Sequence, residues 1–187
     1  MALTHSLVGF ATCLSLIVFY AGAAPFGQIN DVGNAVLGVL TIPLARLLTA
    51  TPSGASGVRA GGGSSVAIVV VVVGAAVTVV GTVLVMSEIT GFYLAGLWSS
   101  FGFALIGVWL VAAHWHRSAD LRRAGLIAGV VMMLGLIGVP GILMGLDDMD
   151  NAPAWTFVAG ISWAGTYLLF PAWSLRLAGR DSPERVR

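Results

Sequence analysis

The sequence predicts an all-α fold: a polytopic membrane helical bundle of six transmembrane helices, with both termini in the cytoplasm. Three observations predict it. Of the 187 residues, 58% are hydrophobic and 9% are charged, whereas a soluble domain carries roughly a quarter charged residues. Apolar runs recur along the chain, and each reaches the roughly 20 residues that a bilayer crossing requires. All nine basic residues are arginines, and the predicted topology places them on one side.

The expected helices follow these apolar runs, and they cover residues 7–24, 31–48, 66–86, 92–113, 126–146 and 154–175. Strands of a membrane barrel would alternate apolar and polar residues, and these runs do not alternate. The valines at 69–73 favour β structure, but they lie inside a run long enough for a spanning helix. We expect one transmembrane domain over 1–187, whose residues 176–187 form a short basic cytoplasmic tail.

The first run has an alternative interpretation. Ala21, Gly22 and Ala23 follow an apolar stretch and are similar to the small-residue cleavage site of a signal peptide. A signal peptide also begins with basic residues, and only His5 precedes this run. We therefore expect the first helix to belong to the mature protein.

The second expected helix is the weakest of the six. It contains Asn34, Pro43 and Arg46. An arginine near a helix end costs little, because its side chain reaches the lipid headgroups. We expect a full crossing, and the alternative is a five-span protein in which this segment is a re-entrant or surface helix.

Charge placement gives the orientation. In the six-helix topology the inner segments are residues 1–6, 49–65, 114–125 and 176–187, and the arginines lie in or beside the last three. Asp31, Glu88 and the acidic residues at 147–150 lie on the other side. The positive-inside rule makes the arginine side cytoplasmic, so we expect a multi-pass protein of the plasma membrane. If the second helix did not cross, only the N-terminus would change side.

Small residues at helical spacing predict close helix packing. They are Gly96, Ser100 and Ala104 in the fourth helix, with Gly125, Gly129, Gly141 and Gly145 in or beside the fifth. Such faces let two helix backbones approach in lipid. We expect contacts within one chain, and the alternative is a homo-oligomer. Pro140, close to several glycines, is a candidate kink because proline removes a helical hydrogen bond.

The candidates for a polar or transport site are Asp31, Asn34 and Glu88. A carboxylate partly withdrawn from water can hold a proton or a cation. The simpler interpretation makes Asp31 a helix cap and Glu88 a solvated loop charge. In the last helix, we expect Trp163 and Tyr167 to form hydrogen bonds between helices rather than to line a ligand pocket.

The histidines and several tryptophans are expected at the cytoplasmic boundary of the bilayer. They are His5, His114, His116, Trp109, Trp115 and Trp173. Amphipathic rings favour that depth. His114 and His116 are two residues apart, so they point in different directions on a helix and do not share a ligand face.

Several functions lack the residues that they need. Without a lysine, no retinal-like cofactor can form a Schiff base, and with Cys13 alone, no intrachain disulfide can form. GxSxG, Walker A, GxGxxG and HExxH motifs are absent from the sequence. A net charge of +1 does not favour a nucleic-acid partner. We expect no cofactor and no enzymatic activity.

The function predicted from these features is binding or assembly in the lipid bilayer, as a homo-oligomer or as an accessory subunit of a larger membrane complex. The alternative is a small transporter or channel for a proton, a cation or a small uncharged solute. A continuous polar cavity across the bundle would favour transport, whereas an apolar core would count against it unless a second conformation opens a path.

Overall fold

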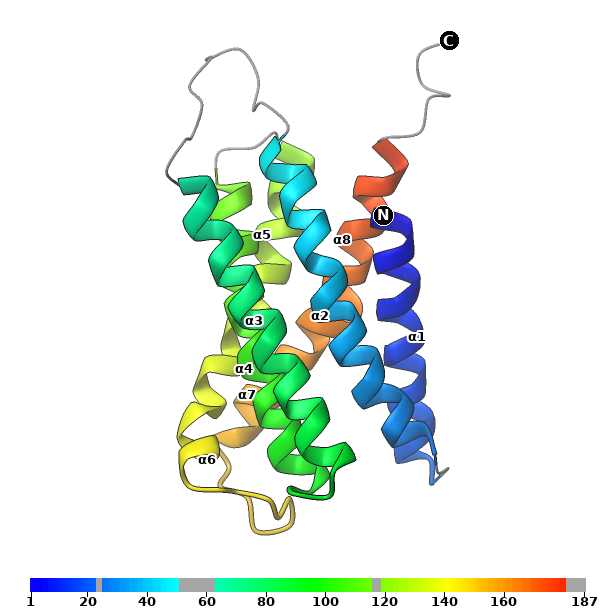
Figure 1. The fold of residues 1–187 in the computed structure, drawn as a ribbon, viewed down its shortest axis with the longest axis vertical. Helices are drawn as coiled ribbons and strands as arrows, with labels where there is room; N and C mark the ends of the chain where they lie inside the picture. The colour runs from blue at the N-terminus through cyan, green and yellow to red at the C-terminus, as the bar shows by residue number, and fades with distance from the viewer. Residues whose placement is uncertain (23–24, 51–62, 116–118, 181–187) are drawn as a thin grey trace.

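The computed structural model describes residues 1–22, 25–50, 63–115 and 119–180, and every regular element among them is helical. In chain order the elements are α1 (Ala2–Tyr20), α2 (Phe26–Ala50), α3 (Gly63–Met86), α4 (Phe92–His114), α5 (Ala119–Met133), η1 (Leu134–Gly138), α6 (Val139–Leu143), α7 (Thr156–Ala164), η2 (Gly165–Leu169) and α8 (Phe170–Arg180). They run up and down in one bundle (Figure 1). We call the end at which α1 begins the upper end and the opposite end the lower end.

Several of these helices are long and apolar enough to cross a membrane, which indicates a membrane protein. They are five stretches: Ala2–Tyr20, Phe26–Thr49, Ser65–Met86, Phe92–His114 and Leu121–Leu143. α7, η2 and α8 follow one another without a gap, and we call this continuous helical segment the last row of helix. It also extends along the bundle (Figure 1). It is not one of the five, so the sixth crossing remains a prediction.

The first two helices begin earlier than hydropathy predicts. α1 starts at Ala2 instead of residue 7, and α2 starts at Phe26 instead of residue 31. The added turns carry polar residues such as His5 and Asn30, which are each 1% exposed. Because these polar side chains point into the bundle, they are not exposed to the apolar lipid. α2 then continues for 25 residues through Pro43.

α5, η1 and α6 also form one continuous helical segment, the fifth row of helix. This row and the last row each contain one turn that is not α-helical. η1 is a 3-10 turn that ends two residues before Pro140, and η2 is a π turn that ends two residues before Pro171. A proline cannot donate to the carbonyl four residues earlier, and its ring crowds that carbonyl. Here the carbonyls belong to Leu136 and Tyr167, the middle residues of the two irregular turns. α8 then extends through Arg180, so residues 176–180 are helical, and the rest of the expected basic tail lies outside the described residues.

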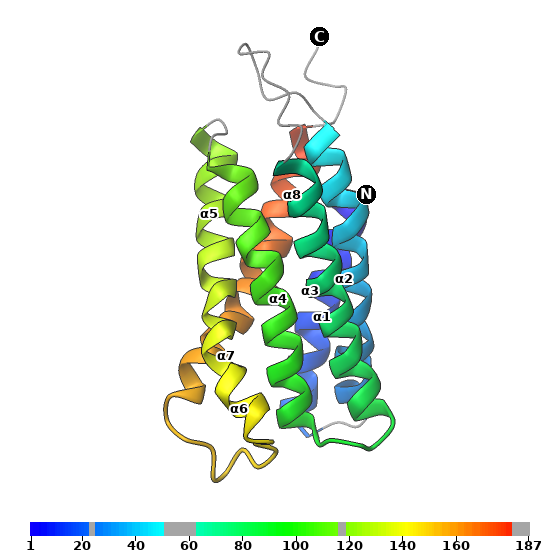
Figure 2. The same ribbon diagram turned by 60° about the vertical axis from the view of Figure 1, so that its left-hand side comes forward.

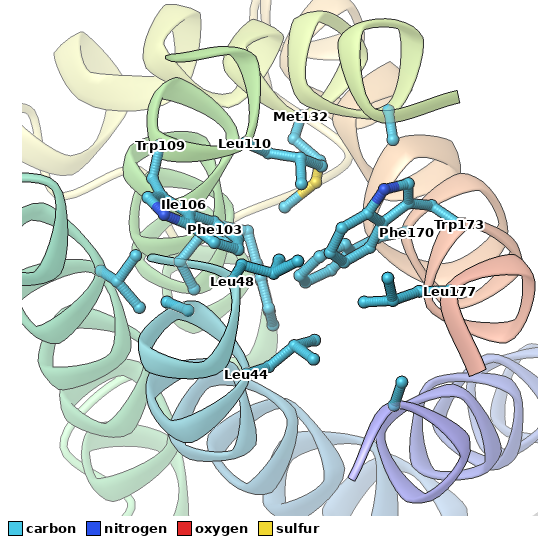
Figure 3. Packing of buried hydrophobic residues seen from close by; sticks show 14 of the residues in the cluster. Leu44, Leu48, Phe103, Ile106, Trp109, Leu110, Met132, Phe170, Trp173 and Leu177 are labelled. Atoms are coloured by element: carbon cyan, nitrogen blue, oxygen red, sulfur yellow. The ribbon is translucent and has the colours of Figure 1, made fainter. Parts of the chain in front are cut away.

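α4 is the most buried of the candidate spans and occupies the centre of the bundle. Figure 2 shows it between α3 and α5, and α1 packs between α2 and α8 on the other side. The main core lies towards the upper end, where large side chains of α2, α4, α5 and α8 converge (Figure 3). Trp109 and Trp173, expected at the bilayer boundary, are 1% and 0% exposed within this core. Trp115 is exposed.

The small residues of α4 serve two contacts. A Cβ added to Gly102 would lie 2.5 Å from the carbonyl oxygen of Gly74, so backbone meets backbone where α4 crosses α3. The predicted face of α4 turns the other way. Ser100 receives a hydrogen bond from Trp163 at 2.8 Å, and Gly96 lies against the same indole ring.

The other predicted packing residues also have neighbours inside the chain. Gly129 approaches the Gly107 backbone of α4, and Gly125 lies against the His114 ring. Gly141 contacts Leu97, and Ala104, 0% exposed, faces Gly135 of η1. Gly145 has a φ of +63° and no neighbour for a Cβ, so it serves a turn rather than a packing face.

At the lower end, one carboxylate links the loop after α6 to the start of α4. Asp147 follows α6, and its side chain accepts hydrogen bonds from the backbone N–H groups of Gly91 and Leu94. These groups belong to the first turn of α4, whose N–H groups have no partner within the helix. A charge at this end also favours the helix dipole. The contact fixes the loop after α6 against the start of α4.

Candidate functional site

Polar side chains line one face of α2. Asn30, Asn34 and Thr41 are 1%, 3% and 0% exposed, and Leu37 lies between the last two at 0%. Their spacing of four, three and four residues keeps them on one side of a helix. That side faces α1 and the last row of helix, because side chains of both bind to it. We call the interface of α1, α2 and the η2–α8 segment the three-helix seam.

The lower part of the seam is a hydrogen-bonded cluster. The Asn30 amide donates to the Thr12 carbonyl at 3.0 Å, and the Asn34 amide donates to the Asn30 side-chain oxygen at 3.3 Å. The Tyr167 hydroxyl donates to the Asn34 side-chain oxygen at 2.9 Å. These hydrogen bonds join α1, α2 and η2. We call the side chains of Asn30, Asp31, Asn34 and Tyr167 the lower cluster.

Asp31 adds a carboxylate to the lower cluster. Its side chain is 5% exposed, and its backbone carbonyl accepts a hydrogen bond from the Thr82 hydroxyl at 2.7 Å. Asp31 is three residues before Asn34 on α2, so the two side chains lie side by side on the helix surface. Among the residues that the structure describes, no arginine or histidine forms an ion pair with it. Within the described part of the chain, Asp31 is therefore a buried acid whose carboxylate has no ion-pair partner.

The π turn η2 positions Tyr167. A Cβ on Gly165 would lie 2.8 Å from the Met132 backbone nitrogen, so only glycine lets the last row approach α5 this closely. Pro171 leaves the Tyr167 carbonyl without its α-helical donor, and the wider π turn accommodates it. Such π turns inside α-helices are frequent at functional sites.

The upper part of the seam is centred on His5. Its Nδ1 lies 3.1 Å from the Ser174 hydroxyl of α8, and its Nε2 lies 3.2 Å from the Thr41 hydroxyl of α2. The ring also meets Phe170 edge-on at a centroid distance of 4.5 Å. We call His5, Thr41 and Ser174 the upper cluster. His5, which the sequence predicts at the cytoplasmic boundary of the bilayer, is a buried hydrogen-bonding residue near the start of α1.

An apolar layer separates the two clusters. Leu37 of α2 and Phe170 of α8 are both 0% exposed. Gly9 of α1 completes the layer, since a Cβ there would lie 2.3 Å from the Pro171 ring and 3.6 Å from Leu37. Each of the three helices thus contributes a polar residue below, an apolar or small residue in the middle, and a polar residue above. The seam is closed in this conformation.

His114 is a second buried histidine, 0% exposed, and its tautomer follows from its partners. Its Nδ1 lies 2.9 Å from the Leu110 carbonyl, which can only accept, so Nδ1 carries a proton. Its Nε2 accepts a hydrogen bond from the Trp173 indole N–H at 3.1 Å. The ring is therefore neutral and holds Trp173 in the core. It too was expected at the boundary, and His116 lies outside the described residues.

The structure brings together two of the three predicted polar candidates. Asp31 and Asn34 both belong to the lower cluster. Glu88 does not: it is exposed in the turn after α3, with a φ of +56°. The expected interhelical hydrogen bonds of Trp163 and Tyr167 are confirmed, with Ser100 and Asn34 as their partners.

Sequence reasoning missed His5, Thr41 and Ser174 as site residues, because hydropathy treats each as an isolated polar residue. The regular spacing of Asn30, Asn34 and Thr41 was a usable signal for a polar helix face. No family model matches the chain, and neither does a curated protein or a solved structure.

Proposed function

We propose that this chain is a small membrane transporter for a proton or a small cation, with the lower cluster as its binding site. The observation that carries the proposal is Asp31, an acid that is 5% exposed inside a helical bundle. An unpaired buried charge costs several kcal/mol. A bound proton or cation would remove that cost, and ionisable residues inside membrane bundles commonly mark ion pathways.

The surroundings of Asp31 support the same function. Side-chain oxygens of Asn30, Asn34 and Tyr167 gather within the lower cluster. Oxygen ligands suit hard cations, and hydroxyl and carboxyl groups can relay protons. The π turn η2 borders this cluster, and interrupted helices are typical of transporter binding sites.

The membrane arrangement in this proposal has six spans. The row from Thr156 to Arg180 supplies the sixth, and the upper end faces the cytoplasm. Arg46, Arg122, Arg123 and Arg176 lie on the last turns of α2, the first turns of α5 and the last turns of α8, which all meet at that end. The positive-inside rule supports this orientation in the plasma membrane.

The closed apolar layer of Gly9, Leu37 and Phe170 favours a carrier over a permanently open channel. A carrier exposes its site to one side at a time, so a closed seam is one of its expected conformations. Assembly as an accessory subunit has less support, because most of the small residues that predict it already have neighbours within the chain.

The test compares Asp31→Asn with Glu88→Gln in proteoliposomes. Both substitutions remove one carboxylate, but only Asp31 lies in the lower cluster. Proton, Na⁺ and K⁺ gradients are imposed in turn, and internal pH or cation content is followed with a fluorescent indicator. We expect flux from the unmodified chain and from Glu88→Gln, and strongly reduced flux from Asp31→Asn. Flux no greater than in empty liposomes, or equal flux from Asp31→Asn, would contradict the proposal.

A further inference from the structure

The hydrogen bonds of the upper cluster depend on how many protons its side chains can donate. The Thr41 hydroxyl lies 2.9 Å from the Leu37 carbonyl oxygen, and the Ser174 hydroxyl lies 2.9 Å from the Pro171 carbonyl oxygen. Each hydroxyl has one proton, and a carbonyl can only accept. When both hydroxyls donate to their carbonyls, each presents only lone pairs to His5. Both ring nitrogens must then donate.

A histidine donates from both nitrogens only when it is protonated. A neutral ring has one N–H and one lone pair, so one of the two hydroxyls must turn away from its carbonyl and donate to the ring. The upper cluster therefore accommodates both protonation states of His5, and the change between them requires the rotation of one hydroxyl. No side chain has to leave its place.

The groups around His5 leave the ring available for this exchange. The titratable and charged side chains described on the elements that pack against α1 are Asp31 and Arg46 of α2, Tyr167 of η2 and Arg176 of α8. Asp31 and Tyr167 belong to the lower cluster, and Arg46 and Arg176 are exposed. None of them is among the hydrogen-bonding partners of His5.

A metal ion fits this position less well than a proton does. Among the described residues, no group of three or more His, Cys, Asp or Glu comes together. The ring nitrogens of His5 are occupied by neutral hydroxyls, which are weak metal ligands but ordinary partners for an N–H group.

We propose that His5 is a second proton-binding site on the three-helix seam, and that the ion carried by this protein is the proton. The inference rests on the transport function proposed above and specifies its substrate. A proton reaching the upper cluster binds the ring lone pair, and the donating hydroxyl returns to its carbonyl. Release to the cytoplasmic side reverses these two steps. Asp31 and His5 thus hold the proton below and above the apolar layer.

The first test measures flux through the full chain in proteoliposomes. His5→Gln keeps hydrogen-bonding groups but cannot bind a proton, and Glu88→Gln is the matched control. We expect proton flux from the unmodified chain and the control, and a fall of about a hundredfold for His5→Gln. Flux of Na⁺ or K⁺ that requires Asp31 but is unchanged in His5→Gln would overturn this inference and leave the transport function standing. Absence of any flux would remove both.

The second test observes the ring directly, so that it holds even where His5→Gln does not fold. The unmodified chain, Thr41→Val and Ser174→Ala are labelled with ¹⁵N-histidine in lipid nanodiscs, and ring nitrogen shifts are followed from about pH 5 to about pH 8. His5→Gln or, failing that, the shifts that change in both hydroxyl variants assign the resonance. We expect His5 to titrate, with a midpoint that moves in both variants. A His5 ring that stays neutral throughout in all three proteins would overturn the proposal.

Discussion

Tyr167 illustrates how much one residue can contribute inside a membrane bundle. It lies in the π turn η2, is 7% exposed, and donates its hydroxyl to Asn34 on another helix. Without that bond the Asn34 oxygen would have to find another donor in a closed environment. An unmade buried hydrogen bond costs more than a made one contributes, so polar residues of the seam specify its geometry.

Tyr167→Phe should therefore destabilise the protein by about 1–3 kcal/mol, since it removes the donor and leaves the Asn34 oxygen without it. Thermal unfolding of the purified chain in detergent would measure the loss. Tyr20→Phe is the matched control, because Tyr20 is 52% exposed. Equal stability of the two variants would mean that the bond to Asn34 contributes nothing.

The loop at the lower end makes a prediction about pH. The Asp148 carboxylate accepts hydrogen bonds from the Asn151 side chain at 2.6 Å and from the Asp150 N–H at 2.9 Å. The bond from Asn151 holds the pKa of Asp148 below its ordinary value of 3.8. Asn151→Ala should raise that pKa towards 3.8, which a carboxyl-carbon NMR titration would detect.

The sign of this effect follows from linkage. A carboxyl whose pKa is lowered in the folded state stabilises the loop above its ordinary pKa, and the contribution disappears as the pH falls through the lower, folded value. The loop of the unmodified chain should accordingly stay ordered to a lower pH than that of Asn151→Ala. An unchanged Asp148 titration would show that Asn151 does not stabilise the charge.

At the scale of helices, the prolines separate into two kinds. Pro140 and Pro171 each follow an irregular turn, whereas Pro43 lies within an unbroken α2. Gly135 and Gly165 within the two irregular turns approach neighbouring backbones: a Cβ would lie 2.4 Å from the Ser100 carbonyl oxygen and 2.8 Å from the Met132 nitrogen, respectively. These contacts bring η1 against α4 and η2 against α5, at the points where the winding of the helices changes.

Close contact between α3 and α4 makes Gly102 a test of packing. A Cβ there would lie 2.5 Å from the Gly74 carbonyl oxygen and 2.8 Å from the Thr78 nitrogen, and backbone atoms cannot move aside easily. Gly102→Ala should cost about 1–3 kcal/mol through overpacking. Gly160→Ala, which meets nothing within 4 Å, should be neutral or stabilising by about 0.5 kcal/mol.

Unfolding of both glycine variants by SDS titration in mixed micelles would provide the comparison. A Gly102→Ala protein as stable as Gly160→Ala would mean that α3 and α4 do not approach as closely as described. The pair also tests the function of small residues in this chain. If they serve folding, the loss in Gly102→Ala should be independent of protein concentration.

At the scale of the whole molecule, the arrangement in the membrane can be tested with single cysteines. Cys13→Ser gives a background without cysteine, because Cys13 is the only one. Thr49→Cys lies at the upper end, and Glu88→Cys and Asp148→Cys lie at the lower end; all three positions are exposed. A membrane-impermeant maleimide applied to intact cells should label the two lower positions and reach Thr49→Cys only after permeabilisation.

Labelling of Thr49→Cys in intact cells, with the lower positions protected, would reverse the proposed orientation. Labelling of Thr49→Cys and Glu88→Cys from the same side would show that α3 does not cross. Equal labelling of all three before permeabilisation would argue against any membrane arrangement of this bundle.

Much of the fold could be predicted from local pattern. The helices from 66–86 and 92–113 agree with α3 and α4 within a few residues, because apolar runs of that length have one stable form in lipid. The starts of α1 and α2 could not be predicted in the same way. Hydropathy assumes that a membrane helix faces lipid, and it discards polar residues such as His5 and Asn30 that face protein.

The candidate site was only partly visible in the sequence. Asp31 and Asn34 lie close together in the chain and could be singled out as polar residues in or beside an apolar segment. Tyr167 reaches them from 133 residues after Asn34, and Ser174 reaches His5 from 169 residues away. No local spacing indicates such partners, since they meet only when the last row of helix packs against α1 and α2.

By itself, the sequence determined that this protein is helical, apolar and asymmetric in charge, because those properties depend on the side chains within each segment. Only the tertiary structure decided which polar residues face one another, and therefore that His5 is buried between two hydroxyls while Glu88 is exposed. The physical reason is that a buried polar group must find its partner across the bundle, and the choice of partner depends on how the helices pack.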